Sequence, residues 1–169
     1  MPRFIKSYVR IVDKVNYRIG RAAMLLIFVM GGVLFYSSIS KAFFRPSLWT
    51  LEFAQFLMVA YFLLGGAYSL QLKGHVRMDL FYGGWKEQTQ SRTDSLTSLI
   101  MIGYLMLLLY GGIDSAIYSI QYSERSYSIW RPYMWPIKVI MCFGIFLMLL
   151  QGISQFFKDW AAARGKPLS

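Results

Sequence analysis

The chain has 169 residues, of which 56% are hydrophobic and only 15% are charged. A soluble domain of this size is usually about half apolar or less and about a quarter charged, so the composition excludes an ordinary soluble fold and indicates a membrane protein. The formal net charge of +10 would suggest nucleic-acid binding in a soluble protein. Here the Lys and Arg residues flank apolar blocks, as they do at membrane boundaries, and nucleic acid is not an expected partner.

The first 21 residues predict an amphipathic helix that precedes the membrane-spanning part of the chain. Its apolar residues recur at helical spacing and share one stripe. They are Phe4, Tyr8, Ile11, Val12, Val15 and Ile19. The opposite face carries Arg3, Lys6, Arg10, Asp13, Lys14 and Arg21. We expect this helix to lie in the plane of the interface, held by anionic membrane lipids, with a second role as a brace for a partner protein.

Four segments are long and apolar enough to cross a hydrocarbon core of about 30 Å. Their predicted bounds are 22–44, 49–72, 95–122 and 132–157. A cytoplasmic interfacial loop is predicted over 73–94, and a cytoplasmic tail over 158–169. The uncharged run in the first segment is longer than the core of a signal peptide, which favours a retained span. The sequence therefore predicts one all-α membrane domain with four transmembrane helices.

Lys and Arg residues are unevenly distributed between the two sides of these spans. Thirteen lie in the N-terminal segment, the 73–94 loop and the C-terminal tail, whereas five lie in the two opposite connections. The positive-inside rule places the richer side in the cytoplasm. Both termini are therefore predicted to be cytoplasmic, in a multi-pass protein of a bacterial inner membrane.

Charged residues near the spans gather at one depth. At a rise of about 1.5 Å per residue, Lys41, Glu52, Asp114 and Lys138 each lie about 30 Å from the inner edge of their helices. We expect these four residues to form an outer collar that pairs internally, with gating or substrate contact as the alternative. No ionisable residue remains at the bilayer midplane, where an ion-coupled carrier usually holds its site.

Glycine pairs occur in three of the predicted spans. They are Gly31-Gly32, Gly65-Gly66 and Gly111-Gly112. Small residues let helix backbones approach closely, so these pairs predict packing within the chain or against a second membrane subunit.

Catalysis is not expected of this chain. The single histidine, His75, lies at a predicted membrane edge, and the single cysteine, Cys142, lies in an apolar run. Neither a metal-ligand spacing nor a glycine-rich phosphate loop is present in the sequence. The sequence therefore predicts a protein that is not an enzyme and holds no cofactor.

Three motifs in chain order suggest a family. The first is Trp49-Thr50-Leu51-Glu52, followed by an uncharged span that contains Gly65-Gly66. The second is Lys73-Gly74-His75-Val76-Arg77-Met78-Asp79-Leu80, and the third is Arg131-Pro132-Tyr133-Met134-Trp135-Pro136. Together with the four-span plan, they resemble the DctQ-like small membrane subunit of tripartite ATP-independent periplasmic (TRAP) transporters, over nearly the whole chain.

The resemblance implies a non-catalytic scaffold subunit. Such a subunit pairs with a large permease subunit that carries the substrate and sodium sites, and a periplasmic binding protein delivers an organic acid, either a carboxylate or a sulfonate. Candidate residues for subunit contacts are Trp49, Glu52, Gly65, Gly66, His75, Arg77, Asp79, Asp114, Arg131 and Lys138. Val76, Leu80 and Phe81 share a helical face of the 73–94 loop, which could lie on lipid headgroups or dock the permease.

Two other functions remain as alternatives. The first is a small four-helix exporter that works as a dimer, although such a carrier usually holds a carboxylate deeper than Glu52 or Asp114. The second is an anchor subunit of a membrane redox enzyme, against which the single histidine argues because a bis-histidine haem needs two axial ligands.

Overall fold

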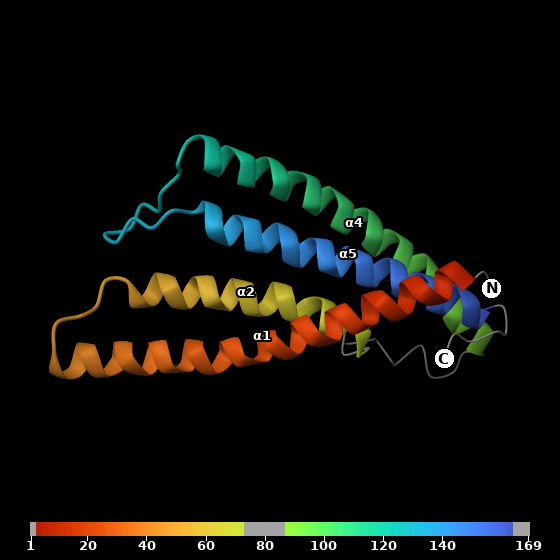
Figure 1. Ribbon diagram of the computed structural model, residues 1–169, viewed down its shortest axis with the longest axis horizontal. Coiled ribbons are helices and arrows are strands. Elements are labelled where there is room, and N and C mark those ends of the chain that lie inside the picture. The colour runs from red at the N-terminus through yellow and green to blue at the C-terminus, as the bar shows by residue number, and fades with distance from the viewer. Residues whose placement is uncertain (1–2, 73–86, 164–169) are drawn as a thin grey trace.

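The computed structural model describes residues 3–72 and 87–163, and within these ranges the chain forms long helices. They are α1 (Arg3–Phe43), α2 (Thr50–Gln71), α4 (Glu87–Gln121) and α5 (Trp135–Ala163) (Figure 1). Each of these four contains a stretch long and apolar enough to cross a membrane. The predicted all-α fold with four membrane-spanning helices is confirmed.

The helix bounds differ from the predicted ones in an informative way. The second span is α2 almost unchanged, whereas α4 begins eight residues before the predicted 95–122 span and α5 extends six residues past the predicted end at 157. Hydropathy marks the part of a helix that lies in hydrocarbon, and hydrogen bonding continues the helix beyond it. α4 and α5 therefore extend beyond the predicted spans on the side where the N-terminal third of α1 lies.

α1 is one continuous helix of 41 residues, so the predicted interfacial segment and the first span are not separated by a break at residue 21. At about 1.5 Å per residue it is about 60 Å long, which is twice the thickness of the hydrocarbon core. Figure 1 shows that α1 bows, with its N-terminal third crossing beside α5. That the N-terminal third lies in the membrane plane stays a prediction.

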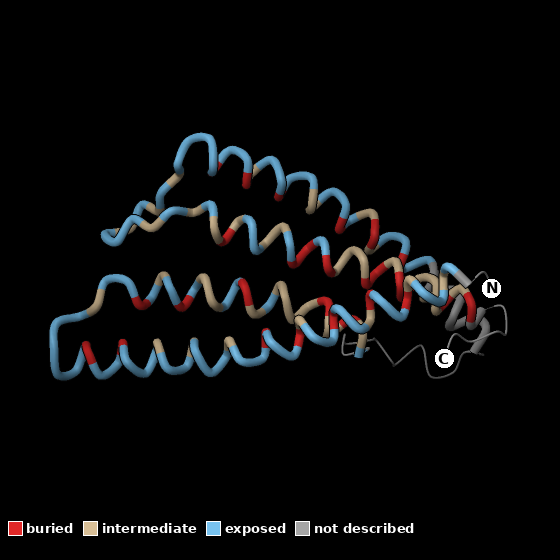
Figure 2. The backbone as a smooth tube through the Cα atoms, viewed as in Figure 1, coloured by how far each residue is buried: buried red, intermediate tan, exposed pale blue. Residues whose placement is uncertain are grey.

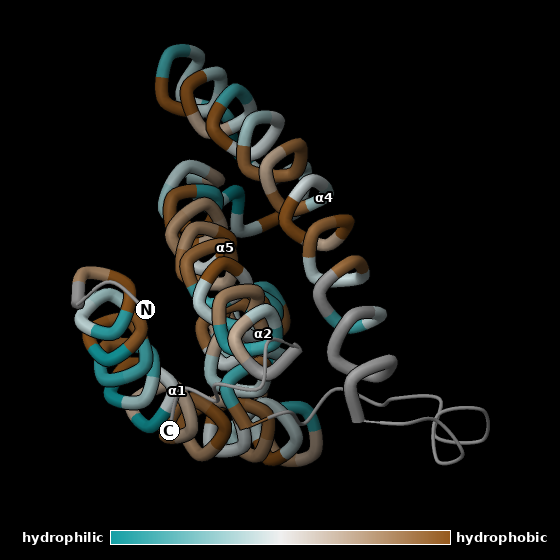
Figure 3. The backbone as a smooth tube through the Cα atoms, turned by 90° about the vertical axis from the view of Figure 1, so that its right-hand side faces the viewer, coloured by the Kyte–Doolittle hydropathy of each residue, from teal (hydrophilic) through white to brown (hydrophobic). Residues whose placement is uncertain are grey.

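The helices form a row in the order α4, α5, α2, α1 (Figures 1 and 3). The main packed pairs are α4 with α5, α5 with α2, and α2 with α1, and a smaller contact joins the N-terminal part of α1 to α5. α1 and α4 therefore lie at opposite edges. The row arises because the α1–α2 and α4–α5 connections each join antiparallel neighbours, and α2 packs against α5 between the two pairs.

Burial follows from this arrangement (Figure 2). In the most apolar window of each helix, 39% of α5 is buried inside the chain, against 11% of α1 and 17% of α4. Large apolar side chains such as Phe28 and Phe35 on α1, and Leu107 and Tyr110 on α4, are at least 70% exposed. Exposed apolar surface of this extent needs lipid or another membrane protein as its solvent.

Close helix approach depends on glycines other than those the sequence pattern singled out. A Cβ atom at Gly144 of α5 would lie 2.8 Å from Leu63 Cβ and 3.0 Å from the Leu63 backbone carbon of α2. At Gly20 of α1 it would lie 2.3 Å from Tyr68 Cβ of α2. These two positions bring the backbones of α5 and α1 against α2 from its two sides.

The three glycine pairs found in the sequence differ in what surrounds them. Gly66 and Gly112 face Met148 and Cys142 of α5, respectively, whereas a Cβ atom at Gly65 or Gly111 would meet no described atom within 4 Å. Gly31 and Gly32 are likewise open. One member of two of the pairs therefore packs within the chain, and the other glycines border open space.

Candidate functional site

The most polar interior of the described chain lies where the N-terminal third of α1 crosses α5. Asn16 of α1 and Gln151 of α5 are both buried, and the Asn16 side-chain amide donates a hydrogen bond of 2.7 Å to the Gln151 carbonyl oxygen. The Gln151 amide in turn donates a 3.0 Å hydrogen bond to Asp13. These side chains form a chain of hydrogen bonds that links the two helices.

An ion pair extends this network toward the inner end. The Lys158 ammonium of α5 lies 2.7 Å from the second carboxylate oxygen of Asp13, and the two side chains are only about a quarter exposed, at 23% and 24%. Ser154, which is fully buried, donates a longer hydrogen bond of 3.4 Å to Asp13. We call Asp13, Asn16, Gln151, Ser154 and Lys158 the inner clasp.

Sequence spacing explains why the inner clasp forms. Asp13 and Asn16 are three residues apart, and Gln151, Ser154 and Lys158 are separated by three and four residues, so each set occupies one helix face. Carboxylate, amide and ammonium groups inside an apolar environment are stabilised only when they are paired, and here all but the Asn16 side-chain oxygen have a partner among the described residues. Apolar contacts flank them: Tyr8 packs its ring edge-on against Phe157 and donates a hydrogen bond to the Leu150 carbonyl.

A second polar cluster joins α4 to α5 at the opposite end. Lys138 of α5 forms a 2.6 Å ion pair with Glu124, which also accepts a hydrogen bond from the buried Ser119 of α4. The Lys138 and Ser119 hydrogen bonds hold the pKa of the Glu124 carboxyl below its ordinary value. A lowered carboxyl pKa contributes stability above the ordinary pKa, and this contribution is lost as the pH falls through the lowered one.

Residues 122–134, which connect α4 to α5, form a hairpin-like turn that we call the outer hairpin. Its arms are joined by a bridge between Arg125 and Tyr133, and the Arg125 guanidinium lies 4.4 Å from the centre of the Tyr133 ring. Ser123 and Arg131 adopt positive φ angles of 48° and 49°, which reverse the chain direction at each side. Tyr127 at the tip is fully exposed.

The α1–α2 connection is tied by hydroxyl groups. The buried Thr50 donates a 2.9 Å hydrogen bond to Ser37 of α1 and lies 2.8 Å from the Ser47 hydroxyl. Ser40 donates to the Arg45 carbonyl at 2.8 Å. Polar contacts between helices therefore lie near both ends of the helices along their length, while the contacts at mid-depth are apolar.

The predicted outer collar does not pair as expected. Lys138 pairs with Glu124, which the sequence reasoning had not considered, rather than with Glu52 or Asp114. Asp114 is exposed on α4, and Lys41 is exposed at the end of α1. One carboxylate oxygen of Glu52 is buried and has no hydrogen-bond partner among the described residues. The prediction of mutual pairing fails at Lys138, because its ammonium is held by Glu124 of the connecting turn although Asp114 lies on the adjacent helix α4.

The other predicted contact residues are spread over the molecule. The Trp49 ring lies at a tilt against Tyr36 and edge-on against Phe53 where α2 begins. Gly65 and Gly66 lie in the inner half of α2, and Arg131 lies in the outer hairpin. His75, Arg77 and Asp79 lie outside the described residues, as do most of the predicted 73–94 loop and the end of the tail. The candidate residues that the structure describes do not come together into one site.

The sequence analysis does not predict the inner clasp, because it places Asp13 on the polar face of the N-terminal helix, opposite the apolar stripe. A signal was present in the sequence. Gln151, Ser154, Gln155 and Lys158 form a polar stripe at helical spacing in the last turns of an otherwise apolar helix. A polar stripe at that depth predicts a polar partner on a neighbouring helix.

The described side chains offer little chemistry. No group of three or more His, Cys, Asp or Glu residues within residues 3–72 and 87–163 could hold a metal ion. Asp13 and Glu124 are each occupied by a lysine and hydroxyl or amide donors. Both clusters are suited to fixing helices at a given crossing rather than to a reaction.

Comparison with known proteins gives one finding. The family model of the DctQ component of tripartite ATP-independent periplasmic transporters matches residues 30–162. No curated protein and no solved structure matches the chain closely enough to serve as a relative. The match begins inside α1, so it includes the α5 half of the inner clasp and excludes Asp13 and Asn16.

Proposed function

The chain belongs to the DctQ component family of tripartite ATP-independent periplasmic transporters, and from this premise we propose that it acts as a non-catalytic scaffold in the inner membrane. In this role it keeps its helices at fixed positions beside a large permease subunit. The permease carries the substrate and sodium sites, and a periplasmic binding protein supplies an organic acid, either a carboxylate or a sulfonate.

The observation that carries this proposal is the distribution of polar groups between helices. The described interhelical polar contacts lie at the inner clasp and near the outer connections, and the middle of the row is apolar. A carrier needs polar groups or broken helices near mid-depth, where its substrate is held. The arrangement supports a rigid layer with two open apolar faces, which suits a subunit that positions another protein.

Transport should therefore depend on the permease. We expect the purified chain, reconstituted alone into liposomes with an imposed sodium gradient, to accumulate no organic acid above empty liposomes. Liposomes that contain both membrane subunits and the binding protein should accumulate it. Saturable, substrate-specific transport by this chain alone would contradict the scaffold proposal and would favour the exporter alternative.

The proposed orientation places both termini in the cytoplasm. In a Cys142→Ser background, a cysteine at Tyr127, at the exposed tip of the outer hairpin, should react with a membrane-impermeant thiol reagent in intact cells. A cysteine at the exposed Ser7 should react only after the inner membrane is permeabilised. The reverse labelling pattern would overturn the orientation.

The N-terminal third of α1 is proposed to brace the subunit at the membrane interface. Ile11 and Val15 are 59% and 41% exposed, so they are available to lipid, whereas Val12 is buried within the chain. An Ile11→Asp/Val15→Asp variant should insert normally and lower uptake by the assembled transporter, because acidic side chains oppose burial near an anionic surface. An Ile11→Leu/Val15→Leu variant is the matched control, and unchanged uptake by the aspartate variant would show that the brace is dispensable.

A further inference from the structure

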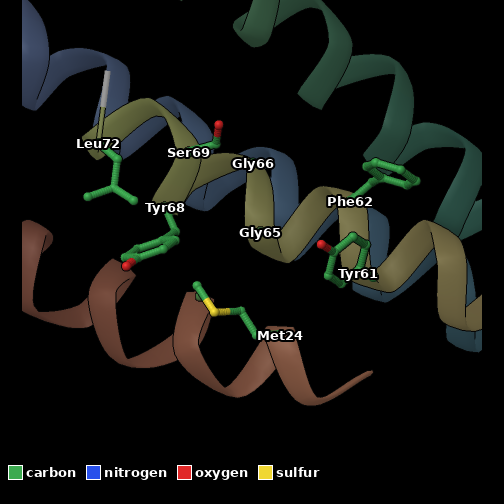
Figure 4. Close-up of a pocket in the computed structure, with 9 residues that line it drawn as sticks. Met24, Tyr61, Phe62, Gly65, Gly66, Tyr68, Ser69 and Leu72 are labelled. Atoms are coloured by element: carbon green, nitrogen blue, oxygen red, sulfur yellow. The ribbon is translucent and has the colours of Figure 1, made fainter. Parts of the chain in front are cut away.

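A groove of approximately 460 Å³ lies between α1 and the inner half of α2. Its walls are mostly apolar, with Gly20 and Met24 contributed by α1 and residues from Tyr61 to Leu72 by α2. Figure 4 shows Met24 and Tyr68 reaching from opposite helices toward one another, with Gly65 and Gly66 between Tyr68 and Tyr61 along α2. A Cβ atom at Gly65 would meet nothing within 4 Å, so the groove is open beside this residue.

The length of the groove matches one leaflet of a membrane. Tyr61 and Leu72 are eleven residues apart on α2, which at about 1.5 Å per residue corresponds to about 16 Å. Half of a hydrocarbon core of about 30 Å is about 15 Å. The groove therefore runs from one edge of the hydrocarbon to near its middle, as a lipid acyl chain does.

A positively charged residue, Arg21, lies at the end of the groove that is nearest the edge of the hydrocarbon. Tyr17, Arg21 and Met24 are separated by four and three residues and share one face of α1. The Arg21 guanidinium lies 5.7 Å from the centre of the Tyr17 ring, and this ring lies 5.8 Å from the ring of Tyr68, which lines the groove. Arg21 is exposed and has no acidic partner among the described ion pairs.

Two further cations extend this charge along α1. Lys14 and Arg18 are both exposed, with Arg18 four residues after Lys14 and three residues before Arg21. An arginine beside a ring can present its planar donors to phosphate oxygens. The head of the groove is thus basic and hydrogen-bond-donating, whereas its length is apolar.

We propose that this groove binds an anionic phospholipid, with one acyl chain along Met24, Phe62 and Gly65 and the phosphate group at Arg21. A transmembrane helix of another subunit could fill the apolar part, but it would leave the cluster of Arg21, Arg18 and Lys14 without a counter-charge. An anionic lipid satisfies both parts at once. The orientation proposed above makes this a lipid of the cytoplasmic leaflet, although the chemistry of the site does not depend on that orientation or on the scaffold function.

The test uses the purified full-length chain, and in parallel its complex with the permease, in native mass spectrometry from detergent containing phosphatidylglycerol or phosphatidylcholine. Gly65→Leu fills the groove, and Arg21→Gln removes the charge at its head. Each change should lower the phosphatidylglycerol-bound fraction roughly tenfold, as expected for loss of one charge-assisted contact or of the acyl-chain site. Gly31→Leu, at an equally open glycine outside the groove, and Lys41→Gln, at the far end of α1, are the matched controls and should bind lipid normally.

Several results would overturn the proposal. Equal retention of phosphatidylcholine by the unmodified chain would remove the requirement for an anionic lipid. Equal loss of phosphatidylglycerol in the control variants would show nonspecific binding. Loss of bound lipid on assembly, together with failure of Gly65→Leu to copurify with the permease, would identify the groove as a subunit interface. Because binding is measured without transport, failure of the scaffold proposal would leave these results unaffected.

Discussion

Replacement of Gly144 by alanine is expected to destabilise the packing of α2 against α5 by about 1–3 kcal/mol, the usual cost of forcing extra volume into a well-packed contact. The added Cβ atom would lie 2.8 Å from Leu63 Cβ, 3.0 Å from the Leu63 carbonyl carbon and 3.1 Å from its oxygen. Two of these three atoms belong to the backbone of α2, so no rotamer change relieves the overlap. The helices must separate, and the α2–α5 contact is the larger of the two contacts that join the α1–α2 pair to the α4–α5 pair.

The measurement is the temperature at which the purified chain loses its monodisperse state in detergent. Gly31→Ala and Gly111→Ala are matched controls, because a Cβ atom at either position meets open space. At those sites alanine should be neutral or slightly stabilising, since it is the better helix former by about 1 kcal/mol. Equal losses of thermal stability at all three positions would show that Gly144 is not a close contact and that α2 and α5 lie further apart than in the structure.

The contrast between Gly144 and the open positions Gly31 and Gly111 also shows which helix contacts cannot be predicted from the sequence. The number of spans was predictable because hydrocarbon thickness alone demands about 20 apolar residues in each. The neighbours of each helix were not, because lipid-facing and helix-facing residues are equally apolar in a membrane protein. Gly144 belongs to no glycine pair and gives no signal in the sequence, whereas the conspicuous Gly31-Gly32 pair borders open space.

Charged residues were misjudged for a related reason. Helix rise predicts the depth of Lys138. Its partner depends on the conformation of the 122–134 turn, which the sequence does not predict. Glu124 meets Lys138 because the outer hairpin reverses at Ser123 and Arg131, both with positive φ angles and neither a glycine. Asp13 was assigned to the polar face because the N-terminal helix was considered alone, and α5 supplies the partner that brings it inside.

The other large expected loss of stability concerns the inner clasp. Gln151→Leu is expected to destabilise the chain by about 1–3 kcal/mol, the penalty for leaving a buried polar group without its hydrogen-bond partner. The substitution keeps a similar volume, but it removes the acceptor of the Asn16 amide and one donor to Asp13. Asn16 is 1% exposed and Gln151 is fully buried, so water cannot replace the lost bonds without opening the contact between α1 and α5.

The double variant Asn16→Leu/Gln151→Leu separates hydrogen bonding from packing. When both members of a buried pair become apolar, no unsatisfied group remains, so the double variant should recover most of the stability lost in Gln151→Leu alone. Asp13 would keep its Ser154 and Lys158 partners in both variants. Thermal unfolding of the wild type, the two single variants and the double variant in detergent completes the cycle. Additive losses would contradict a direct Asn16–Gln151 interaction, whereas a double variant more stable than Gln151→Leu would establish that the clasp fixes where the N-terminal third of α1 crosses α5.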